Sequence, residues 1–158
     1  MPLKKLIASV DCGFATGAVA LTDPNGSFAE VYDLPIVPKE GIDCSVLLDI
    51  FIGGSEVSHI VLEYQMGRPR QSCKSTFNLG LGYGQIISCC QISKIPYTFI
   101  MPQKWKKRMG LTGLPKGASI ELAGEFFPSL RESHLYLKKH EHRSEALLIG
   151  KDYTLHGI

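Results

Sequence analysis

The stretch KLIASVDCGFATGAVALTDPNGSFAEVYDL, residues 5–34, carries the pattern that decides the fold. Residues 5–10 and 18–22 are short, mainly apolar runs, which are typical of strands buried in a sheet. Residues 23–26 read Asp-Pro-Asn-Gly, a turn signal that separates the second run from a third strand over residues 27–34. Three strands in such close succession predict an antiparallel meander.

The rest of the chain alternates helical and strand-like segments. Asp43 is a suitable N-cap for a helix that ends near Ile52, because its side chain can accept hydrogen bonds from the first free backbone N–H groups. A meander followed by such alternation predicts an α/β fold with a mixed five-stranded sheet flanked by helices. The other predicted elements are a strand over residues 58–62, a helix over 75–93, a strand over 96–100, and helices from Pro102, over 116–127 and from Glu141.

Size and composition indicate one globular domain that spans residues 1–158. A chain of 158 residues, 44% hydrophobic and 20% charged, fits a single hydrophobic core. No apolar stretch reaches the roughly 20 residues that a membrane-spanning helix needs. The apolar run that begins at Leu6 stops at Asp11, which is too short for a secretory signal. We therefore expect a cytoplasmic protein with no membrane partner.

The cysteines and the charge distribution narrow the possible ligands. The five cysteines form no Cys-x-x-Cys pair and are odd in number, which argues against a disulfide framework or a zinc knuckle, so we expect free thiols. The net charge of +2 is too small to establish a nucleic-acid partner. Residues 104–116, however, contain no acidic residue and form a local basic patch that can hold phosphates. Its members are Lys104, Lys106, Lys107, Arg108 and Lys116.

Acidic side chains follow two of the predicted strands. Asp11 comes after the first strand and Glu63 after the fourth, so adjacent strands would bring both carboxylates to one edge of the sheet. In the last helix, Glu145 shares a face with Glu141, four residues before it, and with His142, three residues before it. Carboxylate oxygens from separate segments suit Mg²⁺ or Mn²⁺, and two such ions can activate water at a phosphodiester. The alternative is solvated turn residues and a charged first helical turn.

Three familiar motifs are absent from the sequence. His140-Glu141 begins like the zinc-protease motif His-Glu-x-x-His, but the fifth position is Ser144. The glycines around Lys116 do not form a phosphate-binding P-loop, and no Gly-x-Ser-x-Gly nucleophile elbow occurs. We therefore expect no nucleotide cofactor.

Five stretches of the chain, in the same order, resemble the RuvC-type Holliday junction resolvases of the RNase H-like superfamily. The resemblance covers nearly the whole sequence, and its later stretches are similar to the phage and prophage branch. The stretches are IASVDCGFATGAVAL (7–21), VLEYQMGRPRQSCKSTFNLGLGYGQI (61–86), IPYTFIMPQKWKKRMGL (95–111), KGASIELAGEFFP (116–128) and HRSEALLIG (142–150).

The resemblance implies an RNase H-like fold of order βββαβαβα and a homodimer that cuts two opposed strands of a four-way (Holliday) DNA junction. It places Asp11, Glu63 and Glu145 at acidic metal-binding positions, with two Mg²⁺ or Mn²⁺ ions in each active site. Where the phage branch usually has an aspartate as a further ligand, this chain offers Glu141 or His142. The carboxylate of Glu141 suits a hard ion better, whereas the three-residue spacing of His142 matches the wider resolvase pattern.

The resemblance also implies DNA contacts. Lys116 lies near the family's catalytic basic residues and is a candidate for supporting the scissile phosphate, with an ordinary solvated lysine as the alternative. Arg68 and Arg70 lie in the loop that enters the junction centre in the family, although a surface loop with incidental arginines explains them too. Trp105 is expected to be a packing residue, or else to stack on a base. Further expected DNA contacts are Lys74, Lys104, Lys106, Lys107 and Arg108.

The helix over residues 75–93 contains Gly80, Gly82 and Gly84, and each costs about 1 kcal/mol relative to Ala in a helix. Small residues at this spacing indicate close packing against another backbone. The dimer interface of the family involves the corresponding helix, although packing of the glycines against the sheet is the alternative. The side chains expected to mediate self-association are Phe77, Leu81 and Ile87.

Other functions are consistent with the same residues. A nuclease for other branched or flapped DNA, or an RNase H that cleaves RNA–DNA hybrids, would use the same carboxylates. A non-catalytic junction-binding module is a third possibility, because residues 140–142 depart from the family pattern. The style of the motifs favours a phage or prophage origin, and hence the cytoplasm of a bacterium or of a phage-infected host.

Overall fold

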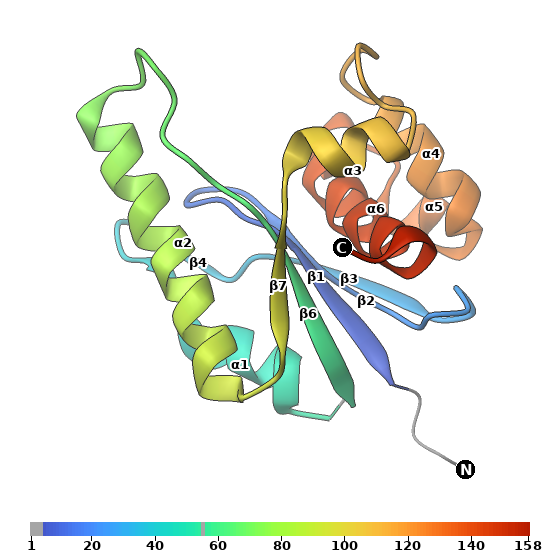
Figure 1. The fold of residues 1–158 in the computed structure, drawn as a ribbon, viewed down its shortest axis with the longest axis horizontal. Helices are drawn as coiled ribbons and strands as arrows, with labels where there is room; N and C mark the ends of the chain where they lie inside the picture. The colour runs from blue at the N-terminus through green and yellow to red at the C-terminus, as the bar shows by residue number, and fades with distance from the viewer. Residues whose placement is uncertain (1–4, 55) are drawn as a thin grey trace.

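The computed structural model describes residues 5–54 and 56–158. Its main sheet has five strands in the order β3-β2-β1-β6-β7 (Figure 1). β1 is antiparallel to β2, and β2 to β3, whereas β6 is parallel to both β1 and β7. The predicted meander and mixed five-stranded sheet are confirmed. The strands are β1 (Leu6–Asp11), β2 (Ala18–Thr22), β3 (Ala29–Asp33), β6 (Val57–Glu63) and β7 (Tyr97–Ile100).

Six α-helices flank the sheet in the described part of the chain. Asp43 caps the first of them as predicted, since its side chain accepts hydrogen bonds from the backbone N–H groups of Ser45 and Val46. The helices are α1 (Cys44–Ile52), α2 (Cys73–Ser93), α3 (Pro102–Arg108), α4 (Ala118–Phe126), α5 (Pro128–His134) and α6 (Glu141–His156).

Four short elements were not predicted: α5, a 3₁₀ turn over Lys138–His140, and the two strands of a small hairpin, β4 (Ile36–Val37) and β5 (Gly41–Ile42). Each is too short to show a clear hydrophobic period, which explains why the sequence pattern does not indicate them. The five-strand topology does not depend on them, because β4 and β5 form a separate two-stranded sheet.

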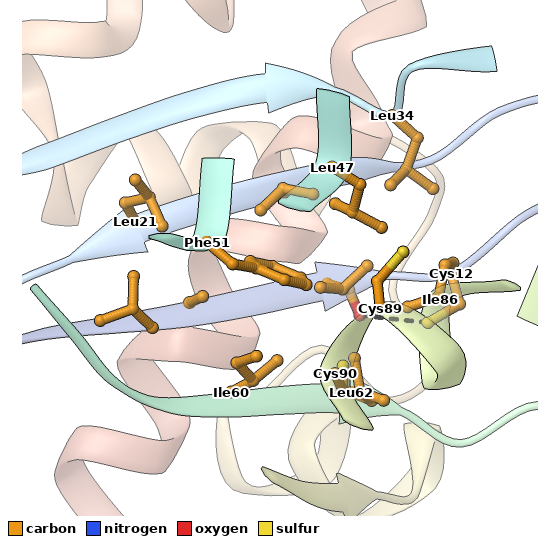
Figure 2. Close-up of a cluster of buried hydrophobic side chains, with 14 of the residues drawn as sticks. Cys12, Leu21, Leu34, Leu47, Phe51, Ile60, Leu62, Ile86, Cys89 and Cys90 are labelled. Carbon is orange, nitrogen blue, oxygen red and sulfur yellow. Dashed lines mark hydrogen bonds between the residues drawn. The ribbon is translucent and has the colours of Figure 1, made fainter. Parts of the chain in front are cut away.

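The sheet separates two hydrophobic clusters. Helices α1 and α2 cover one face, and α3 to α6 lie on the other (Figure 1). Leu6, Ala8 and Val10 of β1 join the first cluster, while Ile7 joins the second, as the alternation of side chains along a strand requires. Figure 2 shows the first cluster, where Phe51 of α1 packs against the strands.

Helix α6 approaches the sheet closely over β1 and β2. The hydroxyl of Ser9 donates a hydrogen bond to the carbonyl oxygen of Ala146 at 2.7 Å. A Cβ atom on Gly150 would lie only 2.7 Å from Ser9 Oγ, so a glycine is needed for this approach. Ser9 and Asp11 point to the same face of β1, and Glu145 adjoins Ala146 in the chain. The contact therefore brings Glu145 toward Asp11.

In the described residues no helix is both long and apolar enough to cross a membrane. The five cysteines all belong to the described part of the chain, and none of them forms a disulfide, as predicted.

Candidate metal centre

Three carboxylates from three elements meet at one edge of the sheet. Asp11 ends β1, Glu63 ends β6, and Glu145 lies in the second turn of α6. One oxygen of each lies within 4.8 Å of the others. The parallel pairing of β1 and β6 places their carboxyl ends side by side, and the short approach of α6 adds the third group.

Glu63 is buried and held by two donors. Its side chain is 5% exposed. The indole Nε1 of Trp105 donates to Oε1 at 2.9 Å, and Nε2 of Gln65 donates to Oε2 at 3.0 Å. Burial, reinforced by the charge of Asp11, raises the pKa of the Glu63 carboxyl to about 8, although the Trp105 hydrogen bond opposes the shift.

Glu145 has a cationic partner. The ammonium group of Lys106 lies 2.8 Å from Glu145 Oε1. Burial raises the pKa of the Glu145 carboxyl above its usual value, and the hydrogen bond from Lys106 acts in the opposite direction. Lys106 thus places a positive charge beside the three carboxylates.

The two candidates for a fourth ligand, His142 and Glu141, differ in their distance from the carboxylates. His142 Nδ1 is 2.7 Å from Asp11 Oδ2, and this hydrogen bond raises the pKa of the imidazole. The group of converging oxygens does not include Glu141, which lines a neighbouring cavity. Of the two candidates, therefore, His142, three residues before Glu145, contacts the carboxylate cluster. That either residue binds a metal stays a prediction.

The donor set fits a divalent cation. Three carboxylates with an imidazole at the edge are ligands that Mg²⁺ and Mn²⁺ accept. Burial is the main reason that the pKa values of Glu63 and Glu145 are raised, and repulsion from the nearby carboxylate of Asp11 adds to it. A bound cation would remove that repulsion, so the residues present suit such an ion.

Two cavities open at the carboxylates. The first, of about 500 Å³, contains the three carboxylates and is also lined by Arg68 and Lys106. The second, of about 630 Å³, is lined by His142, Glu145, Lys106 and Lys107, and also by Lys116. A bound phosphate in either cavity would therefore meet both carboxylates and cations.

The other predicted DNA-contact residues lie farther from the carboxylates or are already paired. Arg108 binds the fully buried Asp152, with its Nε 2.9 Å from Oδ1 and its Nη2 on Oδ2. This pair anchors α3 to α6, so Arg108 has a structural partner that the sequence did not indicate. Contact of these residues with DNA stays a prediction, and the exposed ones are Arg70, Lys74 and Lys104.

Trp105 and Gln65 are the site residues that sequence reasoning missed. Trp105 is buried, as a packing residue should be, but its bond to Glu63 spans 42 residues and has no local signal. Gln65 lies two residues after Glu63, where strand alternation would have placed it on the same side. That spacing was the one available indication.

No protein-family model and no curated protein sequence matches the chain. Solved structures do match. The Holliday junction complex of Thermus thermophilus RuvC has a TM-score of 0.63 at 14% identity, covering 94% of this chain and 92% of that one. The yeast mitochondrial Holliday junction resolvase Ydc2 has a TM-score of 0.64 at 13% identity, covering 96% of this chain and 78% of that one.

The fold is therefore an RNase H-like α/β fold with a carboxylate cluster at the sheet edge. Within that class, the chain shares its fold with RuvC and with the mitochondrial resolvase of yeast over nearly its whole length. The expected RuvC-type architecture is confirmed.

Proposed function

We propose that the protein is a divalent-metal-dependent endonuclease that resolves four-way DNA junctions. The observation that carries this proposal is the meeting of Asp11 and Glu63, at the carboxyl ends of adjacent parallel strands, with Glu145 of α6. The fold supports it, because one solved structure of the same fold is RuvC in complex with a Holliday junction substrate.

The three carboxylates, together with His142 or Glu141, would hold two Mg²⁺ or Mn²⁺ ions. Ions bound there supply Lewis-acid activation of water and stabilise charge on the phosphodiester. The residues of the chain would bind and orient the ions, and the burial of Glu63 and the partial burial of Glu145 would limit competition from bulk water. The hydrogen bond between His142 Nδ1 and Asp11 Oδ2 would have to break, and its proton leave, before that nitrogen could bind a cation.

Basic residues around the two cavities would hold the DNA. Lys106 and Lys116 line the cavities at the carboxylates and would contact the phosphates next to the cut, and Arg68 would reach the junction centre from the loop after β6. The exposed cations farther out would contact the duplex arms, so binding weakens as salt rises. These are Arg70, Lys74 and Lys104, whereas Lys107 is exposed where it lines the second cavity.

A homodimer would pair two such sites for cuts on opposed strands. The exposed part of α2 offers the surface, since Phe77 is 70% exposed and a Cβ added at Gly80 would meet nothing within 4 Å. Gly82 instead packs against the Gly13–Phe14 turn, and Ile87 packs against the core. The predicted interface thus keeps Phe77 and Leu81, which line one hollow with Gly80. We place the enzyme in a bacterial or phage-infected cytoplasm.

The test is cleavage of a labelled four-way junction and a matched linear duplex with Mg²⁺, Mn²⁺ or EDTA, using the wild type and Asp11→Asn. We expect paired nicks in the junction alone, lost with EDTA and in the variant. Equal cutting of the duplex would make the protein a general nuclease, and preference for a flap or an RNA–DNA hybrid would assign the alternative substrates. Tight junction binding without any cleavage would indicate a binding module.

A further inference from the structure

Trp105 is not one of the carboxylates, yet it contacts one of them. Its indole is fully buried, and its Nε1–H donates to Glu63 Oε1 at 2.9 Å. Gln65 donates to the second oxygen, Oε2, at 3.0 Å. Each oxygen of Glu63 therefore has one fixed donor, and the two bonds together define the plane of the carboxylate.

The chemistry of the indole limits what Trp105 can do there. An indole N–H donates a hydrogen bond and has no lone pair to offer a cation. Each carboxylate oxygen has room for two partners, so the bonds from Trp105 and Gln65 leave one position on each oxygen for a metal. Outer hydrogen bonds of this kind orient ligating groups, and their loss typically lowers metal affinity by about 10–100-fold.

The next residue on α3 contacts a different carboxylate. Lys106 Nζ lies 2.8 Å from Glu145 Oε1 and 5.2 Å from the centroid of the Trp105 ring. Two consecutive residues of α3 thus hold two carboxylates that come from β6 and α6. The orientation of Glu63 relative to Glu145 therefore depends on α3.

We infer that Trp105 is a positioning residue whose N–H holds Glu63 in the orientation that binds a divalent ion. The inference rests on the proposed function, since it requires a metal at the carboxylates. The Trp105 ring also fills the second hydrophobic cluster together with Phe127 and Leu147. Packing needs the ring, whereas orientation needs only the N–H, so the two roles can be separated by experiment.

The first measurement is the affinity for Mn²⁺ by calorimetry, without DNA. Trp105→Phe keeps an aromatic ring and removes the N–H, and Phe127→Leu is the matched control, because it loosens the same cluster without touching a carboxylate. We expect affinity about 10–100-fold lower in Trp105→Phe and unchanged in Phe127→Leu. Replacement of Trp105 by 3-benzothienylalanine, which keeps the bicyclic shape and lacks the N–H, should lower affinity in the same way.

The second measurement uses fluorescence. The chain contains one tryptophan, so its indole emission comes from Trp105 alone. Titration with Mg²⁺ should change that emission as Glu63 engages the ion, and Asp11→Asn should move the midpoint to higher concentration. Wild-type affinity in Trp105→Phe and in the benzothienyl variant would overturn the inference and leave the proposed function standing. A wild type that binds no divalent ion would overturn both.

Discussion

Glu63 shows at the scale of one residue how the fold alters ionisation. Burial and Asp11 raise its pKa from 4.5 to about 8. Between these values the folded protein holds a proton that the unfolded chain has lost, so the free energy of unfolding falls as pH rises. Without divalent ions we expect a loss on the order of 2 kcal/mol between pH 5 and 8.5, or roughly 4–8 °C in Tm.

Thermal unfolding in EDTA across that range tests this prediction, with Glu63→Gln as the comparison. The variant should lose most of the slope, because its amide does not ionise. Glu145 and His142 also have raised pKa values and leave a smaller slope of the same sign. The same pH dependence in both proteins would show that Glu63 ionises as an ordinary glutamate does.

At the scale of elements, the position of α6 over the sheet decides where Glu145 lies. In Gly150→Ala the new Cβ would meet Ser9 Oγ at 2.7 Å and Thr22 Oγ1 at 3.1 Å, forcing the helix outward. We expect a loss of about 1–3 kcal/mol in the free energy of unfolding and weaker Mn²⁺ binding. Gly84→Ala on α2 has no atom within 4 Å of its new Cβ and should keep or raise stability. Urea unfolding and calorimetry measure both, and equal stability of the two variants would contradict the argument.

At the scale of the whole molecule, the prediction concerns self-association through the exposed part of α2. Phe77→Glu places a charge on the exposed part of α2, and we expect it to convert a dimer into a folded monomer, because the side chain is 70% exposed within its own protomer. Ile52→Glu, on α1 and 56% exposed, is the control and should remain dimeric. Light scattering after size-exclusion chromatography gives the mass of each. The monomer should cut junctions as unpaired single nicks, and a monomeric wild type would refute the predicted interface.

Site and capping residues that are marked by their neighbours along the chain were predictable from the sequence. The apolar run before Asp11 and the run before Glu63 marked two strands, and an acidic residue at each end indicated the sheet edge that holds the site. Asp43 was predicted as a helix cap from its side chain and position. Such features depend on neighbours along the chain, so the sequence carries them directly. Element α5, with seven residues, lacks enough periodicity to give that signal.

The sequence by itself therefore determined the order of the strands and longer helices, the mixed sheet, and the three carboxylates that could meet. Only the tertiary structure decided that His142 rather than Glu141 contacts Asp11, that Trp105 and Lys106 hold Glu63 and Glu145, and that Arg108 is paired with Asp152. Neighbouring residues on a helix differ by about 100° in direction, so the rotation of α6 about its own axis, which packing sets, decides which of the two side chains faces Asp11. The remaining contacts join residues about forty positions apart, where packing of whole elements sets the distance.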